Sequence, residues 1–270
     1  MAQAPLDRSL ARPTDAPPLA HVEGEPAATE AVPPAAEAPL LPPEDLPRHV
    51  AIIMDGNRRW ARARGLADFE GHAAGVEAIR GLLQHAVRRG VPMLTLYAFS
   101  RENWARSDDE VSGLFDLLGQ AIRNETDELR EQGVRVRLLG RLEELPDATR
   151  SSIGDALDQT AEGTRLQLNI AWNYAGRTEI VDAFRRLLAS GVTPEEVDER
   201  AISEALYTTG LPDPDLVIRT GGEYRISNFL IWQSAYAELV FDECLWPDFG
   251  PESFDTALLE FARRNRRFGR

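Results

Sequence analysis

From Arg48 to the C-terminus, short apolar runs alternate with longer segments in which apolar residues recur at helical spacing. The run 49–54 stops at an Asp-Gly pair, which is typical of a buried strand that ends in a turn. Residues 73–89 have the spacing of an amphipathic helix, and Gly90 can end it. Strands that alternate with helices predict an α/β fold, in which a central mostly parallel sheet is flanked by helices on both faces. Further strands are expected at 93–99, 134–139, 165–171, 216–218 and 238–241, and further helices after 107–110 and at 147–161, 177–190, 195–207 and 251–264.

Residues 1–47 differ in composition from the rest of the chain. They hold 11 of the 18 prolines and no aromatic residue, and their eight acidic and two basic residues contribute −6 to the net charge of −14. Such a segment has too little apolar area to offset the entropy lost on ordering. We therefore expect a disordered Pro/Ala/Glu-rich tail over 1–47 and a single folded domain over 48–270.

Charge and cysteine content exclude several classes of function. The net charge of −14 argues against non-specific nucleic-acid binding, so no nucleic-acid partner is expected. Cys244 is the only cysteine, which excludes an intrachain disulfide and a multi-cysteine metal site and favours a cytoplasmic protein. No segment approaches the roughly 20 apolar residues that a membrane-spanning helix needs.

Polar residues that suit phosphate and metal binding follow several of the expected strands. Ligands of open α/β sheets bind beyond the carboxyl ends of the strands. Asp55 follows the first strand, and Gly56 lets the backbone approach an anion at the start of a helix. Arg219 and Arg225 flank a Gly-Gly turn and can clamp a phosphate. A carboxylate among arginines suits Mg²⁺, which takes one or two carboxylates plus phosphate oxygens, so we expect Asp55 to be a Mg²⁺ ligand at a diphosphate site.

Taken singly, these residues also have structural explanations. An Asp-Gly pair after a strand is often only a turn. Glu110 is expected to form a capping box with Ser107 at a helix start, and a catalytic or loop-closing role is the second alternative. A histidine near a helix start, such as His72, is more often structural than chemical, and Trp104 is also consistent with packing. Only the gathering of phosphate-type donors at one edge of the sheet favours a functional site.

Several long motifs, taken together, resemble the cis-prenyltransferases, and most closely the bacterial members that make undecaprenyl diphosphate. The resemblance covers 48–270 in the expected order and implies that this region is one catalytic domain with a hydrophobic tunnel. The motifs are 49–60 (HVAIIMDGNRRW), 96–104 (LYAFSRENW), 169–177 (NIAWNYAGR), 215–229 (DLVIRTGGEYRISNF), 232–239 (WQSAYAEL) and 245–249 (LWPDF).

The resemblance implies that isopentenyl diphosphate is added in cis to an allylic diphosphate such as farnesyl diphosphate, to build a polyprenyl diphosphate for the cell-wall lipid carrier. Mg²⁺ is the implied cofactor. The resemblance also implies a homodimer. It implies a cytoplasmic enzyme that can make peripheral contact with the inner face of the membrane.

Residue roles also follow from the resemblance. Asp55 and Glu238 are the implied metal ligands, and Glu238 is expected from the side of the partner subunit. The implied catalytic residues are Asp55, Asn57, His72 and Asn103. The implied substrate-binding residues are Gly56, Arg58, Arg59, Trp60, Phe99, Ser100, Glu102, Trp104, Arg106, Arg219, Arg225 and Ser227, of which 99–106 belong to a loop that covers the substrates.

Arg58, Asp68, Ala175 and Trp172 depart from the family pattern, and two of these departures bear on substrate or product. Asp68 stands where the family has an arginine that contacts the allylic diphosphate, so Arg62 or Arg64 would have to compensate. Trp172 is bulkier than the residue expected there and would shorten the product if it faces the tunnel.

Four functions therefore remain open at the level of sequence. The first is a long-chain cis-prenyltransferase, and the second is a shorter-chain relative. The third is a non-catalytic prenyl-diphosphate-binding subunit, which only Asp68 favours. Without the resemblance, the choice would be a Mg²⁺-dependent phosphohydrolase on a doubly wound sheet.

Overall fold

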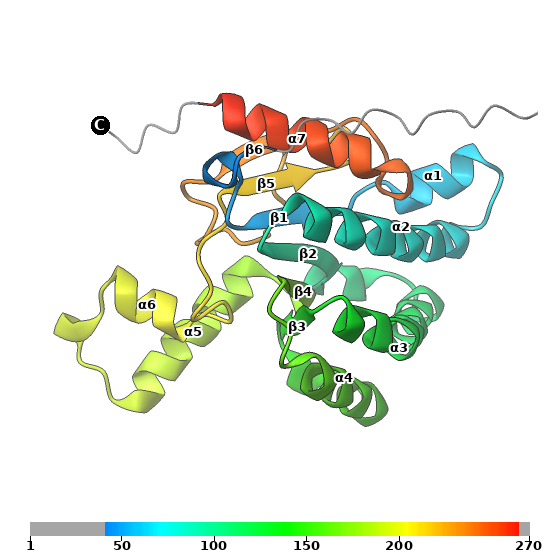
Figure 1. Cartoon of the computed structure of the whole chain (residues 1–270). Helices are drawn as coiled ribbons and strands as arrows, with labels where there is room; N and C mark the ends of the chain where they lie inside the picture. Colours follow the sequence, from blue (N-terminus) through cyan, green and yellow to red (C-terminus); the bar gives the residue numbers. More distant parts are fainter. Residues whose placement is uncertain (1–40, 265–270) are drawn as a thin grey trace, which may run out of the picture. The chain divides into compact units, whose positions relative to one another are not determined.

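The computed structural model describes residues 41–264 as a six-stranded parallel sheet with helices on both faces (Figure 1). The strand order is β3-β4-β2-β1-β5-β6, and every pairing is parallel. The predicted α/β class is confirmed. The strands are β1 (Val50–Ile53), β2 (Met93–Ser100), β3 (Val134–Leu139), β4 (Leu166–Tyr174), β5 (Leu216–Arg219) and β6 (Glu238–Phe241).

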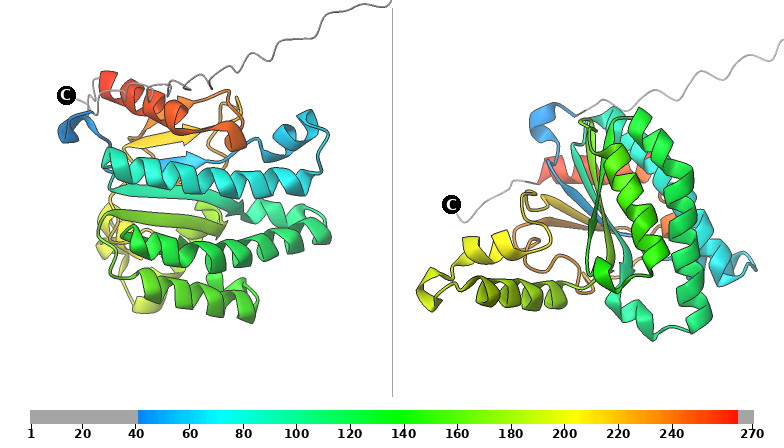
Figure 2. Two further views of the ribbon diagram at one scale, coloured as in Figure 1. Left: turned by 45° about the vertical axis from the view of Figure 1, so that its right-hand side comes forward. Right: turned by 90° about the horizontal axis from the view of Figure 1, so that it is seen from below.

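Helices cover the two faces of the sheet unequally. α2, α3, α4 and α7 pack on one face, whereas α5 and α6 lie on the other (Figure 2). The helices are α1 (Asn57–Ala63), α2 (Asp68–Arg89), α3 (Asp108–Glu131), α4 (Asp147–Thr160), α5 (Gly176–Ser190), α6 (Glu199–Ala205) and α7 (Pro251–Arg263).

Most of the predicted tail lies outside the described residues, so its disorder stays a prediction. Its last residues, 41–47, are described, and Leu41 and Leu46 pack against the core. The ordered chain therefore begins before Arg48.

Strand β1 is central and completely buried, because helices cover both of its faces. Val50 and Ile52 pack in the core under α2 and α7, and Ala51 and Ile53 pack in the core on the side of α5. The apolar run 49–54 was continuous rather than alternating for this reason. Its carboxyl end is thereby fixed in the middle of the sheet.

Three elements differ from the expected bounds by more than one residue at an end. β4 extends to Tyr174, beyond the expected end at 171, and α6 is shorter than the expected helix 195–207. α2 begins at Asp68 rather than at 73, because the Glu70 carboxylate accepts a hydrogen bond from the Ala67 N–H at 2.8 Å and caps the helix.

Two glycines of α2 let this helix lie against the first residue of α1. A Cβ atom at Gly71 would lie 2.1 Å from the carbonyl oxygen of Asn57, and one at Gly75 would lie 2.5 Å from its Oδ1. Neither distance is compatible with a side chain, so both positions require glycine while the two helices keep this contact.

Substitution of two glycines in the same helix tests this packing. Gly71→Ala should lower the free energy of unfolding by about 1–3 kcal/mol, because the new methyl group meets backbone. Gly81→Ala meets no atom within 4 Å and should raise it by roughly 0.5–1 kcal/mol through helix propensity. Urea denaturation measures both; equal effects would contradict the close contact between α1 and α2.

Candidate functional site

Asp55 lies just beyond the end of β1, at the carboxyl edge of the sheet. Its N–H donates to the Thr220 hydroxyl at 2.9 Å, and that hydroxyl donates to the Asp55 carbonyl at 2.7 Å. Gly56 then turns the chain into α1 with φ 116°, and a Cβ atom there would lie 2.8 Å from Leu245. Thr220 stands inside the 215–229 motif, but no role for its side chain was predicted from the sequence.

Two arginines hold the Asp55 carboxylate. Arg219 Nη2 lies 2.8 Å from Asp55 Oδ2, and Arg59 Nη2 lies 3.1 Å from Oδ1. Arg219 also donates to Ser227 Oγ at 2.7 Å, and Arg59 donates to the Gly221 carbonyl at 2.7 Å. The structure thus brings together four residues that the sequence placed in one site from distant segments.

Arg225 contributes its main chain to this cluster. Its carbonyl accepts a hydrogen bond from Arg219 Nη1 at 2.6 Å, whereas its own guanidinium pairs with Glu223 and its side chain is 59% exposed. The expected phosphate clamp of Arg219 and Arg225 is therefore not preformed. Arg225 would have to leave Glu223 to reach a shared phosphate with Arg219.

A second polar cluster surrounds His72 at the start of α2. His72 Nε2 lies 3.8 Å from Glu110 Oε1, which also accepts a hydrogen bond from Arg106 Nη1 at 2.7 Å. The expected capping box is wrong, because Ser107 makes no side-chain cap. The Glu110 carboxylate instead points to Arg106 and His72. Burial, followed by the charge of Arg106, lowers the pKa of His72, so its imidazole is neutral at pH 7.

Asp68 does not stand alone at this edge. Arg62 donates to both of its carboxylate oxygens, at 2.8 and 2.7 Å, and Arg58 donates at 2.6 Å. The hydrogen bonds from Arg62 and then Arg58 hold the pKa of Asp68 well below its usual range. The three side chains together carry a net positive charge, so this position still presents guanidinium groups to an anion.

Trp60 and Arg64 point to a different carboxylate. Trp60 Nε1 donates to Asp248 Oδ1 at 2.7 Å, Arg64 Nη2 lies 3.1 Å from Asp248 Oδ2, and the Arg64 guanidinium lies 4.2 Å from the centre of the indole ring. Of the two arginines expected to compensate for Asp68, it is therefore Arg62 that contacts it.

The segment after β2 forms a short 3-10 helix, η2 (Arg101–Ala105). Phe99 is buried before it, and Ser100 N–H donates to Asn103 Oδ1 at 3.0 Å, which gives this amide a capping role. Glu102 accepts from Asn228 Nδ2 at 2.7 Å, and Trp104 is 42% exposed. The segment thus bridges the sheet edge to the loop that carries Ser227.

An apolar cavity of about 160 Å³ adjoins the polar edge. It lies between the sheet and helices α2, α3 and α4, and Met54, Asn57 and His72 are among its lining residues. Because β4 runs toward the polar edge, Trp172 lines the near end and Leu168 lies deeper. Trp172 stacks on Phe99 with ring centres 5.1 Å apart.

The far part of the cavity meets a charged contact between α2 and α3. Arg80 Nε donates to Glu125 Oε2 at 2.9 Å. Gln84 and Gln132 both donate to Glu128 Oε1, at 2.8 and 2.7 Å. An apolar chain that entered at Asn57 would thus meet ion-paired side chains at the other end.

Three buried polar atoms at the site have no hydrogen-bond partner within the part of the chain that is described. They are Asn57 Oδ1, His72 Nε2 and Arg219 Nε. Buried polar atoms are nearly always paired in native proteins, so such exceptions call for an explanation. Polar atoms of a ligand at this edge would supply it.

Glu238 lies at the other end of the sheet from Asp55. It pairs in register with Leu216, which pairs with Val50, the first residue of β1. The length of β1 and the residues after it separate the two carboxylates by roughly 16 Å along the strands. Glu238 Oε2 is bound to Arg264 at 3.0 Å. The structure therefore does not bring the two expected metal ligands together within one chain.

Residues 41–264 contain no cluster of three Asp, Glu, His or Cys side chains that could hold a metal ion by itself. No helix in this range is long and apolar enough to cross a membrane.

Comparison with known proteins gives a consistent result. The family model described as putative undecaprenyl diphosphate synthase matches residues 53–269. An isoprenyl transferase of Heliobacterium mobile is 49% identical over 233 residues, which cover 85% of this chain and 90% of the relative. One from Brucella abortus is 50% identical over 227 residues, which cover 83% and 89%.

Two solved structures of prenyl diphosphate synthases have a similar fold. Lavandulyl diphosphate synthase from Lavandula x intermedia, in complex with dimethylallyl diphosphate, has a TM-score of 0.81 at 35% identity, over 84% of this chain and all of that one. A probable undecaprenyl diphosphate synthase from Campylobacter jejuni has a TM-score of 0.71 at 32% identity, over 83% of this chain and 99% of that one. Because the family model matches most of the chain and these relatives are about half identical to it, the chain belongs to the isoprenyl transferase family of cis-prenyltransferases.

Proposed function

We propose that this enzyme adds isopentenyl diphosphate units in cis to an allylic diphosphate, with farnesyl diphosphate as the primer and undecaprenyl diphosphate as the product. The observation that carries the proposal is the junction between the Asp55–Arg219 cluster and the apolar cavity. A prenyl diphosphate has the same division, with a charged head and an apolar tail. The three unpartnered polar atoms lie where the head would bind.

The arginines of the site suit the charge that develops in such a reaction. Negative charge grows on the leaving diphosphate as its C–O bond breaks, and fixed donors aimed there stabilise the transition state more than the ground state. The diphosphate of the allylic substrate would bind on the side of Asn57 and His72. Arg59 lies there, as do Arg58 and Arg62, which both bind Asp68. Arg219 would hold the second diphosphate next to Ser227.

Mg²⁺ is the metal that we propose for this site. The protein offers the Asp55 carboxylate, whose side chain is partly accessible, and no larger cluster of acidic ligands among the described residues. That sparse set suits Mg²⁺, which completes its shell with phosphate oxygens and water. When bound, the ion would neutralise charge on the leaving diphosphate.

We further propose a homodimer in which the second copy brings its own Glu238 to Asp55. Because one chain holds these carboxylates far apart along the strands, a metal site that used both would need the Glu238 of a second chain. An exposed apolar stripe on α5, formed by Val181, Phe184 and Leu188, offers a surface that a second copy can cover.

Trp172 favours a product shorter than undecaprenyl diphosphate, which is the alternative proposal. Its indole occupies the near end of the cavity, and its Nε1 has no hydrogen-bond partner in the described chain. The growing prenyl chain would have to pass this ring before it reaches the deeper part of the cavity, which apolar residues of α2 and α3 line.

Incubation with farnesyl diphosphate, labelled isopentenyl diphosphate and Mg²⁺ tests the reaction. The wild-type protein should form polyprenyl diphosphates, and Asp55→Ala should lower kcat at least about 100-fold, because the loss falls on transition-state charge. Arg200→Gln, in an exposed ion pair on α6, serves as the control. Absence of elongation would refute the proposal, and release of inorganic phosphate instead would indicate a phosphohydrolase.

Product length tests the role of Trp172. Trp172→Leu keeps an apolar side chain but removes the ring, so the product distribution should move up by at least one isoprene unit. Thin-layer chromatography of the dephosphorylated products measures this shift. A distribution that is unchanged or shorter would show that Trp172 does not limit the chain.

Mixing of two inactive variants tests the shared metal site. Asp55→Ala and Glu238→Ala should each lose activity, whereas a dimer of one chain of each retains one site with both carboxylates. Unfolded and refolded together, the mixture should recover about a quarter of wild-type activity, since about half of the dimers are mixed. If the mixture is no more active than either variant alone, the two carboxylates of a site do not come from different chains, and the shared site is refuted.

A further inference from the structure

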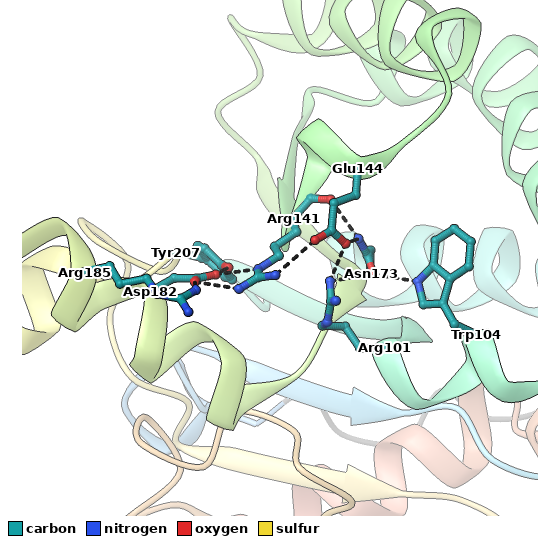
Figure 3. Close-up of polar contacts among 8 residues, drawn as sticks. All are labelled: Arg101, Trp104, Arg141, Glu144, Asn173, Asp182, Arg185 and Tyr207. Carbon is teal, nitrogen blue, oxygen red and sulfur yellow. Dashed lines mark hydrogen bonds and ion pairs between the residues drawn. The ribbon is translucent and has the colours of Figure 1, made fainter.

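A network of polar side chains ties the segment 100–106 to the opposite face of the sheet (Figure 3). It starts at Trp104 and Arg101 in η2, passes through Asn173 and the turn after β3, and ends at α5. None of these contacts belongs to the diphosphate site. Together they join the segment 100–106 to the turn after β3 and to α5.

Asn173 is the hub of this network. Its Oδ1 accepts from Trp104 Nε1 at 2.8 Å, and its Nδ2 donates to the Arg141 carbonyl at 2.8 Å and to Glu144 Oε2 at 2.9 Å. The side chain is fully buried and the backbone has φ 51°, a conformation that asparagine tolerates better than most residues. A reversed amide would set donors against Trp104 and Arg101, so only one orientation satisfies all partners.

Glu144 connects Asn173 to the segment 100–106 through an ion pair with Arg101. Its carboxylate is paired with Arg101 and with Arg141, in addition to Asn173. Burial opposes its ionisation, but the hydrogen bonds from Asn173, Arg101 and Arg141 outweigh burial and lower the pKa of Glu144 to about 2. The carboxylate therefore stays charged and keeps Arg101 attached at neutral pH.

Arg141 anchors the hub to the far face of the sheet. It binds both carboxylate oxygens of Asp182 in α5, each at 2.7 Å, and Asp182 also accepts a hydrogen bond from the Tyr207 hydroxyl at 2.5 Å. Gly140 permits this placement, because a Cβ atom there would lie 1.9 Å from the Trp172 carbonyl oxygen. The loop is thus held by a framework that reaches across β4.

We propose that Asn173 and Glu144 are positioning residues that hold the segment 100–106 over the bound substrates. The inference rests on the proposed function, because that function gives the segment substrates to cover. The segment reaches the isopentenyl diphosphate side through Glu102, which binds Asn228 beside Ser227. Loosening the hub lowers the fraction of molecules with the segment in place, and apparent affinity falls by that fraction.

Glu144→Gln tests the proposal with a nearly isosteric change. It should raise KM for isopentenyl diphosphate about tenfold, as expected for loss of a charge-assisted hydrogen bond, while kcat changes less than about threefold because saturating substrate restores the covered state. Amide hydrogen exchange at 100–106 should quicken about tenfold without substrate. Asp182→Asn, which loosens the anchor from a distance, should shift both quantities in the same direction.

Arg185→Gln is the matched control. Arg185 binds the same Asp182 at 3.1 Å but lies off the path to the loop, so KM and exchange should stay within about twofold of wild type. Unchanged KM and exchange in Glu144→Gln, or an equal effect in Arg185→Gln, would overturn the proposal. Exchange needs no turnover, so the absence of activity in wild-type protein would refute the proposed function without deciding this inference.

Discussion

The site depends on the ion pair between Asp55 and Arg219. The Arg219 side chain is only 5% exposed, and a buried guanidinium requires a carboxylate and further acceptors to compensate for lost hydration. Asp55, Ser227 and the Arg225 carbonyl supply them. One guanidinium thereby fixes the end of β1, the end of β5 and the loop that follows, so the two expected diphosphate sites share one charged centre.

The site also depends on an abrupt boundary between the polar edge of the sheet and the apolar cavity. Asn57 and His72 stand at the boundary, since both belong to the polar edge and both line the cavity. Gly71 and Gly75 create this boundary by bringing α2 against Asn57. A larger residue at either glycine would move the cavity wall away from the diphosphate-type donors.

The sheet and the cluster around Asp55 could be predicted, because apolar runs report burial and the carboxyl ends of parallel strands meet at one edge. Three other features could not. The role of Glu110 depends on where Arg106 and His72 fold, which the capping pattern does not reveal. Arg62 was expected to compensate for Asp68, but the second contact, from Arg58, depends on how α1 lies against the start of α2. The distance of Glu238 from Asp55 depends on the register of an edge strand.

The contact between Arg80 and Glu125 gives the cavity a property beyond its volume. Under the proposed function, a prenyl chain that outgrew the space between the sheet and the helices would have to separate α2 from α3, and this ion pair with the Gln84–Glu128–Gln132 contacts would oppose that movement. Product length would then depend on how firmly these contacts join the two helices as well as on the volume of the cavity.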